Sequence, residues 1–210
     1  MDLFAGQALE TLADGAALLR GFALPEAELL LAGVARVAQV APFRRMVTPG
    51  GYTMSVAMTN CGTAGWVTDR TGYRYDRIDP ETGQPWPDFP PGFADLAART
   101  AEEVGFSGYR PDSCLINRYV PGTQLSLHQD RNERDFGQPI VSVSLGLPAV
   151  ILFGGLKRGD RPRRLALTHG DVVVWGGPAR MVFHGVARLA DGEHPATGRS
   201  RINLTFRRAF

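Results

Sequence analysis

The sequence predicts a mainly β domain with flanking helices, an α+β protein whose core is a jelly roll or cupin-like barrel. Eight short runs of strand-forming residues follow one another between residues 113 and 208, separated by turn sequences such as PG, GG and HGD. Two segments with helical periodicity precede them, with a glycine- and proline-rich stretch in between. Antiparallel strands in this number form a closed barrel or a double sheet.

The first part of the chain, residues 1–45, is expected to be helical. Residues 24–40 (LPEAELLLAGVARVAQV) carry apolar side chains at helical spacing, with a proline and acidic residues near the start. The opening sequence MDLFAGQALETLADG has no basic flank followed by an apolar run, and no later stretch is long enough to cross a bilayer. We therefore expect no signal peptide, no membrane span and a cytoplasmic protein.

The next part, residues 46–92, is rich in glycine and proline, which suits short strands and loops. It also carries Tyr52, Trp66, Tyr73, Tyr75 and Trp86. Helical periodicity returns in residues 93–106 (FADLAARTAEEVGF) and should stop near Gly105.

The remainder, residues 113–208, supplies the expected β core. Its strands are SCLINRYV, QLSLHQD, PIVSVSLGL, AVILFGG, RLALTHG, DVVVWGG, MVFHGVARL and RINLTFRR. With 44% hydrophobic and 21% charged residues, the whole chain 1–210 is expected to be one domain with a sizeable core. The cysteines, Cys61 and Cys114, are far apart and form no CxxC motif, as is usual in a reducing cytosol.

The charge distribution limits how this chain could bind nucleic acid. A formal net charge of +2 is too small for a protein that coats nucleic acid along its whole surface. Basic residues do gather in the segments KRGDRPRR (157–164) and RSRINLTFRR (199–208). Any binding of nucleic acid should therefore be local.

The last strand alternates strictly between polar and apolar side chains. Arg201, Asn203, Thr205 and Arg207 share one face, and the other face is apolar. The polar face could lie in water, as in an outer strand. It could instead face a barrel interior that holds an anionic ligand, which arginine is suited to bind. In SCLINRYV, Asn117 and Tyr119 likewise share a face and could donate hydrogen bonds into a pocket, although a mixed strand with a snorkelling arginine is also possible.

A metal site is predicted from the stretch LSLHQDRN. His128 and Asp130 share a strand face there, and His184 lies in a later predicted strand. Two histidines and one carboxylate form a facial triad that leaves positions open on Fe(II). Zinc accepts the same ligands, so a structural metal remains an alternative. His169 and His194 lie in a turn and a polar loop and are not expected to be ligands.

Longer blocks of sequence carry a more specific signal. NRYVPGTQLSLHQD, IVSVSLGLPAV, FGGLKR, HGDVVVWGG and RINLTFR, together with the earlier block MTNCGTAGWVTDRTGYRYDRIDPETGQPWP, occur in this order. Over roughly residues 50–208 the chain resembles the AlkB family of oxidative nucleic-acid dealkylases, close to its bacterial members. The resemblance implies a double-stranded β-helix core, with residues 46–92 as a nucleotide-recognition lid.

The resemblance also implies ligands for a cofactor and a co-substrate. Fe(II) would be held by His128, Asp130 and His184. For 2-oxoglutarate, Arg201 would bind the far carboxylate and Arg207 the near one. Further hydrogen bonds would come from Asn117, Tyr119 and Asn203.

The implied reaction is oxidative demethylation of 1-methyladenine and 3-methylcytosine in DNA, with RNA as a further target. It uses O2 and releases formaldehyde, succinate and CO2, which repairs the base directly. The lesion would be reached in a single strand or by flipping it from the duplex. Trp66 would stack on the base with Tyr73 nearby, and Arg158 would contact phosphate. Tyr52, Tyr75 and Trp86 are equally well explained by packing, and Arg163 and Arg164 by a solvated turn.

The chain departs from the family pattern at Asn132, where bacterial members have an aspartate near the substrate base. The amide can form hydrogen bonds but supplies no charge, so we expect an altered preference between the two lesions or a lower rate. Glu133 is adjacent and its one-residue offset points it elsewhere. Alternatives are a 2-oxoglutarate oxygenase acting on methylated tRNA or a small metabolite, and a noncatalytic nucleic-acid-binding cupin. No protein partner is indicated, and a monomer is expected.

Overall fold

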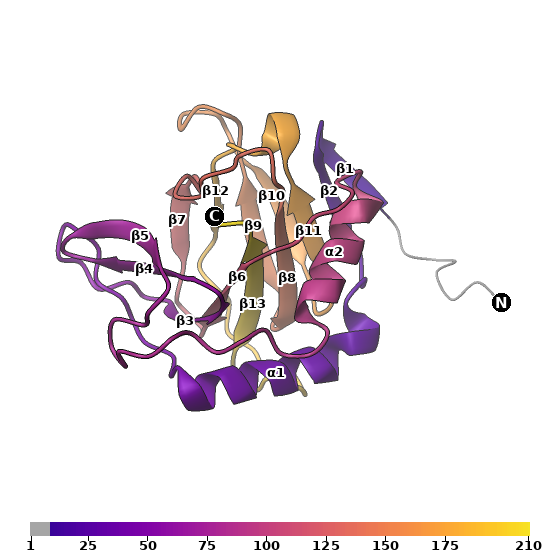
Figure 1. Cartoon of the computed structure of the whole chain (residues 1–210). Helices are drawn as coiled ribbons and strands as arrows, with labels where there is room; N and C mark the ends of the chain where they lie inside the picture. Colours follow the sequence, from indigo (N-terminus) through magenta and orange to yellow (C-terminus); the bar gives the residue numbers. More distant parts are fainter. Residues whose placement is uncertain (1–8) are drawn as a thin grey trace.

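Two antiparallel sheets face each other and form the core of the protein (Figure 1). The computed structural model describes residues 9–210. The larger sheet has seven strands in the order β1 (Leu9–Ala13), β2 (Ala16–Leu19), β11 (Val172–Trp175), β8 (Ile140–Gly146), β13 (Arg201–Arg207), β6 (Ser113–Tyr119) and β3 (Ala57–Gly62). The smaller has four, in the order β10 (Arg163–Leu167), β9 (Ala149–Phe153), β12 (His184–Val186) and β7 (Leu125–His128).

All eight strands predicted between residues 113 and 208 are present, as β6 to β13. The expected class, mainly β with flanking helices around a jelly-roll core, is therefore confirmed. One detail is different, because Arg163 and Arg164 open strand β10 and do not form a solvated turn. Arg163 donates a hydrogen bond to the carbonyl oxygen of Leu12 at 2.8 Å and pairs with Glu10.

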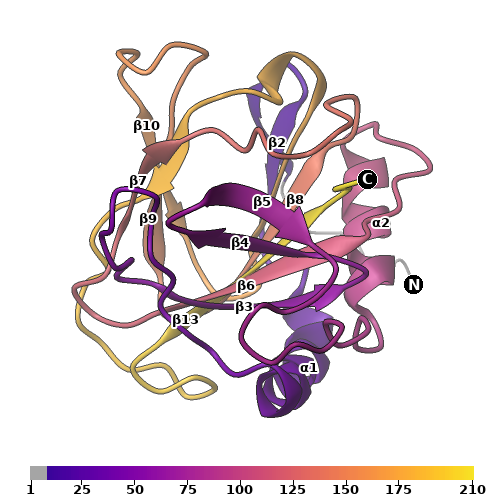
Figure 2. The same ribbon diagram turned by 60° about the vertical axis from the view of Figure 1, so that its left-hand side comes forward.

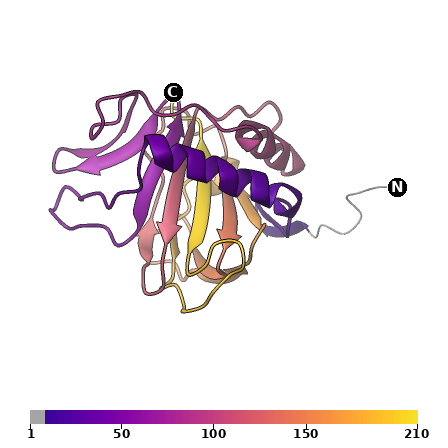
Figure 3. The ribbon, with the colours of Figure 1, turned by 90° about the horizontal axis from the view of Figure 1, so that it is seen from below.

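Two helices cover the outer face of the larger sheet. After a 3-10 turn at Leu24–Glu26, α1 spans Ala27–Val40, and α2 spans Phe93–Glu103. Gly105 follows α2 with a φ of 90°, a conformation that favours glycine and ends the helix where the sequence predicted. Figure 3 shows α1 lying across the strands of this sheet. Within residues 9–210, neither helix is long and apolar enough to cross a membrane.

The prediction that residues 1–45 are helical is wrong for residues 9–19. These form a hairpin, β1 and β2, whose second strand pairs with β11. The turn is Asp14-Gly15, a common two-residue hairpin sequence, and Gly15 has a φ of 74°. Alanine and leucine favour helices, but pairing with β11 buries all four residues of β2 and overrides that preference. Residues 1–8 of the predicted helical part lie outside the described residues.

Polar and apolar side chains alternate along β13, so one face of this strand joins the apolar core under the helices and the other faces the smaller sheet. Ile202, Leu204 and Phe206 pack against α1 and α2 in one apolar cluster. The polar side chains of the same strand face the smaller sheet. The region between the sheets is thus apolar at its margins and polar near its centre.

A third element lies outside both sheets. Strands β4 (Gly65–Asp69) and β5 (Gly72–Asp76) pair only with each other among the described residues. They lie within the segment 46–92, and Figure 2 brings this hairpin to the front. Trp86 of the same segment is buried and donates its indole N–H to the carbonyl oxygen of Asp76 at 2.9 Å, so it serves packing.

Candidate active site

A cavity of about 700 Å³ opens between the two sheets and beside the β4–β5 hairpin. Its walls come from strands of both sheets, from the hairpin and from the loop after β7. The lining side chains include Trp66, Tyr73, Asn117, Tyr119, His128, Asp130, Asn132, Arg158, His184, Asn203 and Arg207. The residues that the sequence placed in one site therefore surround one space, except Arg201, which is fully buried and does not line this cavity.

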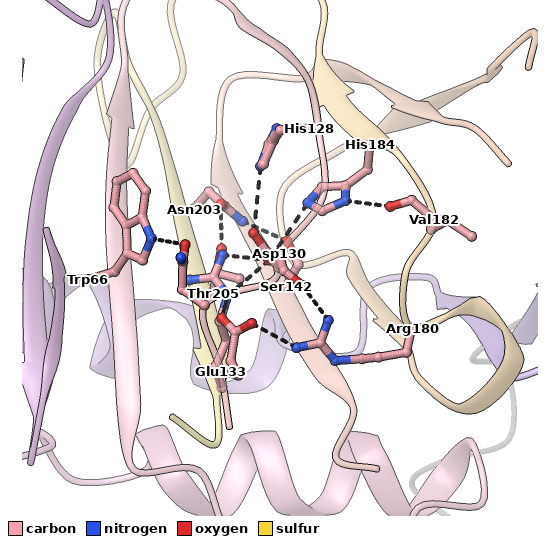
Figure 4. A network of polar contacts seen from close by, with 12 residues as sticks. Trp66, His128, Asp130, Glu133, Ser142, Arg180, Val182, His184, Asn203 and Thr205 are labelled. Atoms are coloured by element: carbon pink, nitrogen blue, oxygen red, sulfur yellow. Dashed lines mark hydrogen bonds and ion pairs between the residues drawn. The ribbon is translucent and has the colours of Figure 1, made fainter. Parts of the chain in front are cut away.

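Three potential metal ligands meet at one end of this cavity. His128 is the last residue of β7, and His184 opens β12, directly opposite it in the paired strands. Asp130 follows two residues after β7. One ligand atom from each residue lies within 4.8 Å of the others, and both histidine Nε2 atoms are 3.7 Å from the Asp130 carboxylate (Figure 4). Strand pairing thus assembles the predicted triad.

Backbone contacts orient both imidazole rings toward Asp130. The Nδ1 atoms of His128 and His184 lie 2.9 and 3.2 Å from the carbonyl oxygens of Ser126 and Val182. A carbonyl only accepts, so each Nδ1 carries the proton and each Nε2 keeps a free lone pair. Burial also lowers the pKa of His184 to about 4, so this ring is neutral and able to bind metal near pH 7.

Asp130 is held as a carboxylate by Arg207. The guanidinium donates from Nε and Nη2 to Oδ2 of Asp130 at 2.9 and 2.7 Å. Burial alone would raise the pKa of Asp130, but Arg207 and the two imidazoles lower it well below its usual range. Nη1 of Arg207 is buried without a partner among the described residues, so one donor remains available to a ligand.

Arg201 is the clearest sign that the site takes an anion. Its side chain is fully buried, at 0% exposure, and pairs with no carboxylate in residues 9–210. It donates to Ser144 Oγ at 2.8 Å and lies over the ring of Tyr119, while Nε and Nη1 have no partner. Burial lowers the pKa of Arg201. A buried cation without a counter-charge is costly unless a ligand supplies one.

The polar face of β13 therefore looks into the protein, so the interpretation as an outer strand with its polar face in water is wrong, and the inward orientation of the second interpretation is confirmed. Asn203 accepts a hydrogen bond from Asn117 at 3.2 Å and donates to Ser142 Oγ at 2.8 Å. Oδ1 of Asn117 remains unpartnered among the described residues. Two buried guanidinium groups with free N–H donors fit a small dicarboxylate such as 2-oxoglutarate.

Aromatic side chains line the wall formed by the hairpin. The rings of Trp66 on β4 and Tyr73 on β5 are stacked, with centroids 5.8 Å apart and planes 23° apart. Asn132 ties them together: its Oδ1 accepts the indole N–H of Trp66 at 3.1 Å, and its Nδ2 lies 3.5 Å from the carbonyl oxygen of Tyr73. Arg158 lines the cavity from the far side, over the ring of Phe183.

No local sequence pattern indicates the buried ion pair that lies beside the triad. Glu133 and Arg180 lie 3.0 Å apart with side chains 2% and 3% exposed. Glu133 does not line the cavity, which agrees with the prediction that its one-residue offset from Asn132 points it elsewhere. Tyr75, left undecided between packing and function, donates its hydroxyl to Glu133 at 2.5 Å. Arg180 and Tyr75 lie 47 and 58 positions from Glu133 in the sequence, so no local sequence pattern could have predicted these contacts.

The other two histidines are not part of the triad. His169 and His194 lie beside each other with ring centroids 4.6 Å apart. His169 accepts the backbone N–H of Gly146 through Nδ1. Among the described residues, only His128, Asp130 and His184 form a group able to hold a metal, which agrees with the expectation for the remaining two histidines.

The fold and this site together define a class of protein. A double antiparallel sheet that carries a histidine–carboxylate–histidine cluster on the cavity wall, and a buried arginine without a counter-charge on β13, is suited to an Fe(II) oxygenase with a dicarboxylate co-substrate. A profile of the 2OG-Fe(II) oxygenase superfamily matches residues 15–207.

Comparisons with individual proteins narrow this class. The chain is 57% identical to the alpha-ketoglutarate-dependent dioxygenase AlkB of Escherichia coli, over 100% of this chain and 98% of that protein. It is 48% identical to an AlkB homolog of Caulobacter vibrioides, over 87% and 80%. The solved structure of OsALKBH1 superposes with a TM-score of 0.82 at 27% identity, over 96% of this chain and 100% of that one.

The chain therefore belongs to the AlkB family of 2OG-Fe(II) oxygenases. Its cofactor is Fe(II), and its co-substrates are 2-oxoglutarate and O2.

Proposed function

We propose that this protein oxidatively demethylates N-methylated bases, 1-methyladenine and 3-methylcytosine, in DNA and, as a further target, RNA. The observation that carries the proposal is the single cavity that joins the metal triad to a pair of stacked aromatic rings. The names of related proteins support a nucleic-acid substrate: "tRNA demethylase abh1" of Schizosaccharomyces pombe and "Nucleic acid dioxygenase ALKBH1" of mouse.

At the metal end, we assign His128, Asp130 and His184 as the ligands of Fe(II). When bound, the iron supplies the chemistry that activates O2 for removal of hydrogen from the methyl group. Arg201 binds the far carboxylate of 2-oxoglutarate, and the free Nη1 of Arg207 binds the near one. Further hydrogen bonds come from Asn117, Tyr119 and Asn203.

At the hairpin end, we assign Trp66 and Tyr73 as the surface that binds the methylated base. These lesion bases are cations, and an aromatic face attracts a desolvated cation by about 1 to 2 kcal/mol. The base must leave the duplex to reach the cavity, so single strands and poorly paired lesions are the preferred substrates. Arg158 lies on the cavity rim to contact phosphate, and residues 46–92 form the lid. We further propose that the protein acts as a monomer in the cytoplasm.

The decisive experiment uses oligonucleotides that each carry one methyl lesion, incubated with Fe(II) and with or without 2-oxoglutarate. Loss of the methyl mass and release of formaldehyde, both dependent on 2-oxoglutarate, are expected. Trp66→Ala is expected to lower kcat/KM for these substrates about 10- to 100-fold, because stacking of a base on an aromatic ring contributes about 1–3 kcal/mol.

The Trp66→Ala variant has a control within the same protein. Anaerobic addition of 2-oxoglutarate to the Fe(II) protein should give a visible charge-transfer band, which Trp66→Ala should leave unchanged. A variant that demethylates DNA at the wild-type rate would contradict the assignment and favour methylated tRNA or a small metabolite as substrate. A wild-type protein without the band would favour a structural metal.

Asn132 offers a test of how charge sets lesion preference. Asn132→Asp keeps an acceptor for the Trp66 indole and adds a negative charge at an exposed position beside the cavity. We expect kcat/KM to rise about two- to fivefold for the cationic lesions, as for a partly screened charge pair. The neutral base 3-methylthymine is the control and should not gain. Equal rates for variant and wild type on both cationic lesions would rule out this role.

A further inference from the structure

Glu133 accepts hydrogen bonds or ion pairs from three separate parts of the fold, although it lines no part of the cavity. Its Oε1 accepts the hydroxyl of Tyr75 and lies 3.5 Å from Nε of Arg207. Its Oε2 accepts Nη2 of Arg180 at 3.0 Å. A buried carboxylate needs several donors to be stable, and here each donor comes from a different structural element. Figure 4 shows the pair of Glu133 with Arg180.

Arg180 connects this carboxylate to the two segments that carry metal ligands. Its Nη1 donates to the backbone oxygen of Asp130 at 2.8 Å, and its Nε donates to the backbone oxygen of Gln138 at 3.1 Å. It lies just after the 3-10 turn Gly177–Ala179, in the connection that leads to His184. The backbone that presents Asp130 is thereby fixed to the backbone that presents His184.

Tyr75 connects the same carboxylate to the hairpin. It pairs directly with Trp66 in the β4–β5 ladder and lies two residues from Tyr73, on the same face of strand β5. Burial raises the pKa of Tyr75, so its hydroxyl stays protonated and donates. Its ring also meets that of Phe210, which lies between the guanidinium groups of Arg77 and Arg134 at 4.8 and 4.7 Å.

We propose that Glu133 is a positioning residue that couples the base-binding hairpin to Asp130 and Arg207. Arg207 shares its guanidinium between Asp130 and Glu133. Without the Tyr75 hydroxyl, Arg207 would be the remaining donor to Oε1 of Glu133. The Arg207 guanidinium would then shift toward Glu133 and away from Asp130. Seating of the hairpin and alignment of the 2-oxoglutarate site would then be disturbed together. This inference rests on the proposed function.

The test compares Tyr75→Phe, Glu133→Gln and the double variant with the wild type. Each single variant is expected to raise the KM for a lesion oligonucleotide about tenfold, the size of effect typical for a hydrogen bond to a charged group. Succinate should form in excess over formaldehyde, because oxidation would proceed with the base poorly seated. The double variant should be no worse than Glu133→Gln within about twofold, since both changes break the same contact.

Two substitutions of the same chemistry serve as controls. Glu103→Gln changes an exposed carboxylate at the end of α2 to an amide, and Tyr109→Phe removes a buried hydroxyl that has no partner among the described residues. Neither should change the KM or the ratio of succinate to formaldehyde.

A readout without turnover separates this inference from the proposed function. Amide hydrogen exchange of residues 65–76 should slow on addition of Mn(II) and 2-oxoglutarate in the wild type, and much less in Tyr75→Phe. The coupling is refuted if Tyr75→Phe keeps the wild-type KM, product ratio and exchange, or if the two single effects multiply in the double variant. If Glu133→Gln does not fold, Tyr75→Phe decides alone. Absence of formaldehyde from the wild type would overturn the proposed function, and the exchange experiment would still decide the coupling.

Discussion

Replacing Arg201 with methionine is expected to abolish binding of 2-oxoglutarate while leaving the apoprotein at least as stable as the wild type. Arg201 is buried and has no counter-charge among residues 9–210. Loss of a buried, hydrogen-bonded charge pair costs about 2–5 kcal/mol, so the affinity for 2-oxoglutarate should fall roughly 30- to 5000-fold. The anaerobic charge-transfer band, titrated with 2-oxoglutarate, measures this directly.

Most substitutions of buried residues destabilise a protein, but we expect Arg201→Met not to lower the stability of the apoprotein. A methionine replaces an unpaired charge with an apolar side chain of similar length, a change that is often neutral or stabilising by about 1–4 kcal/mol. We expect Tm to stay equal or to rise by several degrees.

Arg207→Met is the matched comparison, since it changes the same residue type on the same strand, β13. It leaves the buried carboxylates of Asp130 and Glu133 without their shared partner, and it should lower Tm markedly. If Arg201→Met lowers Tm as much as Arg207→Met, or binds 2-oxoglutarate with the wild-type affinity, then Arg201 is not the residue that binds a carboxylate of 2-oxoglutarate.

The second large effect is expected at the metal. With Mn(II) at about 100 times its dissociation constant, binding should stabilise the folded wild type by about 2.7 kcal/mol. For a protein of this size that corresponds to a rise in Tm of about 5 to 10 °C. His184→Gln should remove this rise and reduce demethylation with Fe(II) below detection, because only two ligands remain for an ion that the site binds through three.

His194→Gln provides the control for the metal experiment. His194 lies beside His169 and away from the triad, so its replacement should preserve both the Mn(II)-induced rise in Tm and the turnover. A His184→Gln protein that is still stabilised by Mn(II) to the wild-type extent would show that the triad does not hold the ion.

Much of the fold followed from local patterns. Short runs of strand-forming residues between turn sequences marked all eight strands from β6 to β13, and helical spacing marked α1 and α2. The hairpin of residues 9–19 was missed because its alanine and leucine residues carry no strand signal of their own. Its strand character comes from pairing with β11, which lies more than 150 residues later in the chain.

Local patterns also predicted that the polar residues of β13 share one face of the strand, and that those of β6 do so too. They did not decide whether that face contacts water or the interior of the protein. The answer depends on the smaller sheet, which covers that face and closes a cavity over Asn203 and Arg207, while Arg201 on the same face is fully buried. Because these side chains are buried and not exposed to solvent, their guanidinium groups favour an anionic ligand.

By itself, the sequence predicted the eight strands from β6 to β13, the three candidate metal ligands and the family, because these depend on residue type, spacing and order along the chain. The tertiary structure alone decided that Arg201 has no counter-charge, that Arg207 is bound to Asp130, and that Glu133 joins Tyr75 to Arg180. Such contacts join residues distant in sequence. Their energies depend on burial, which is a property of the folded protein and is not encoded in any short segment of it.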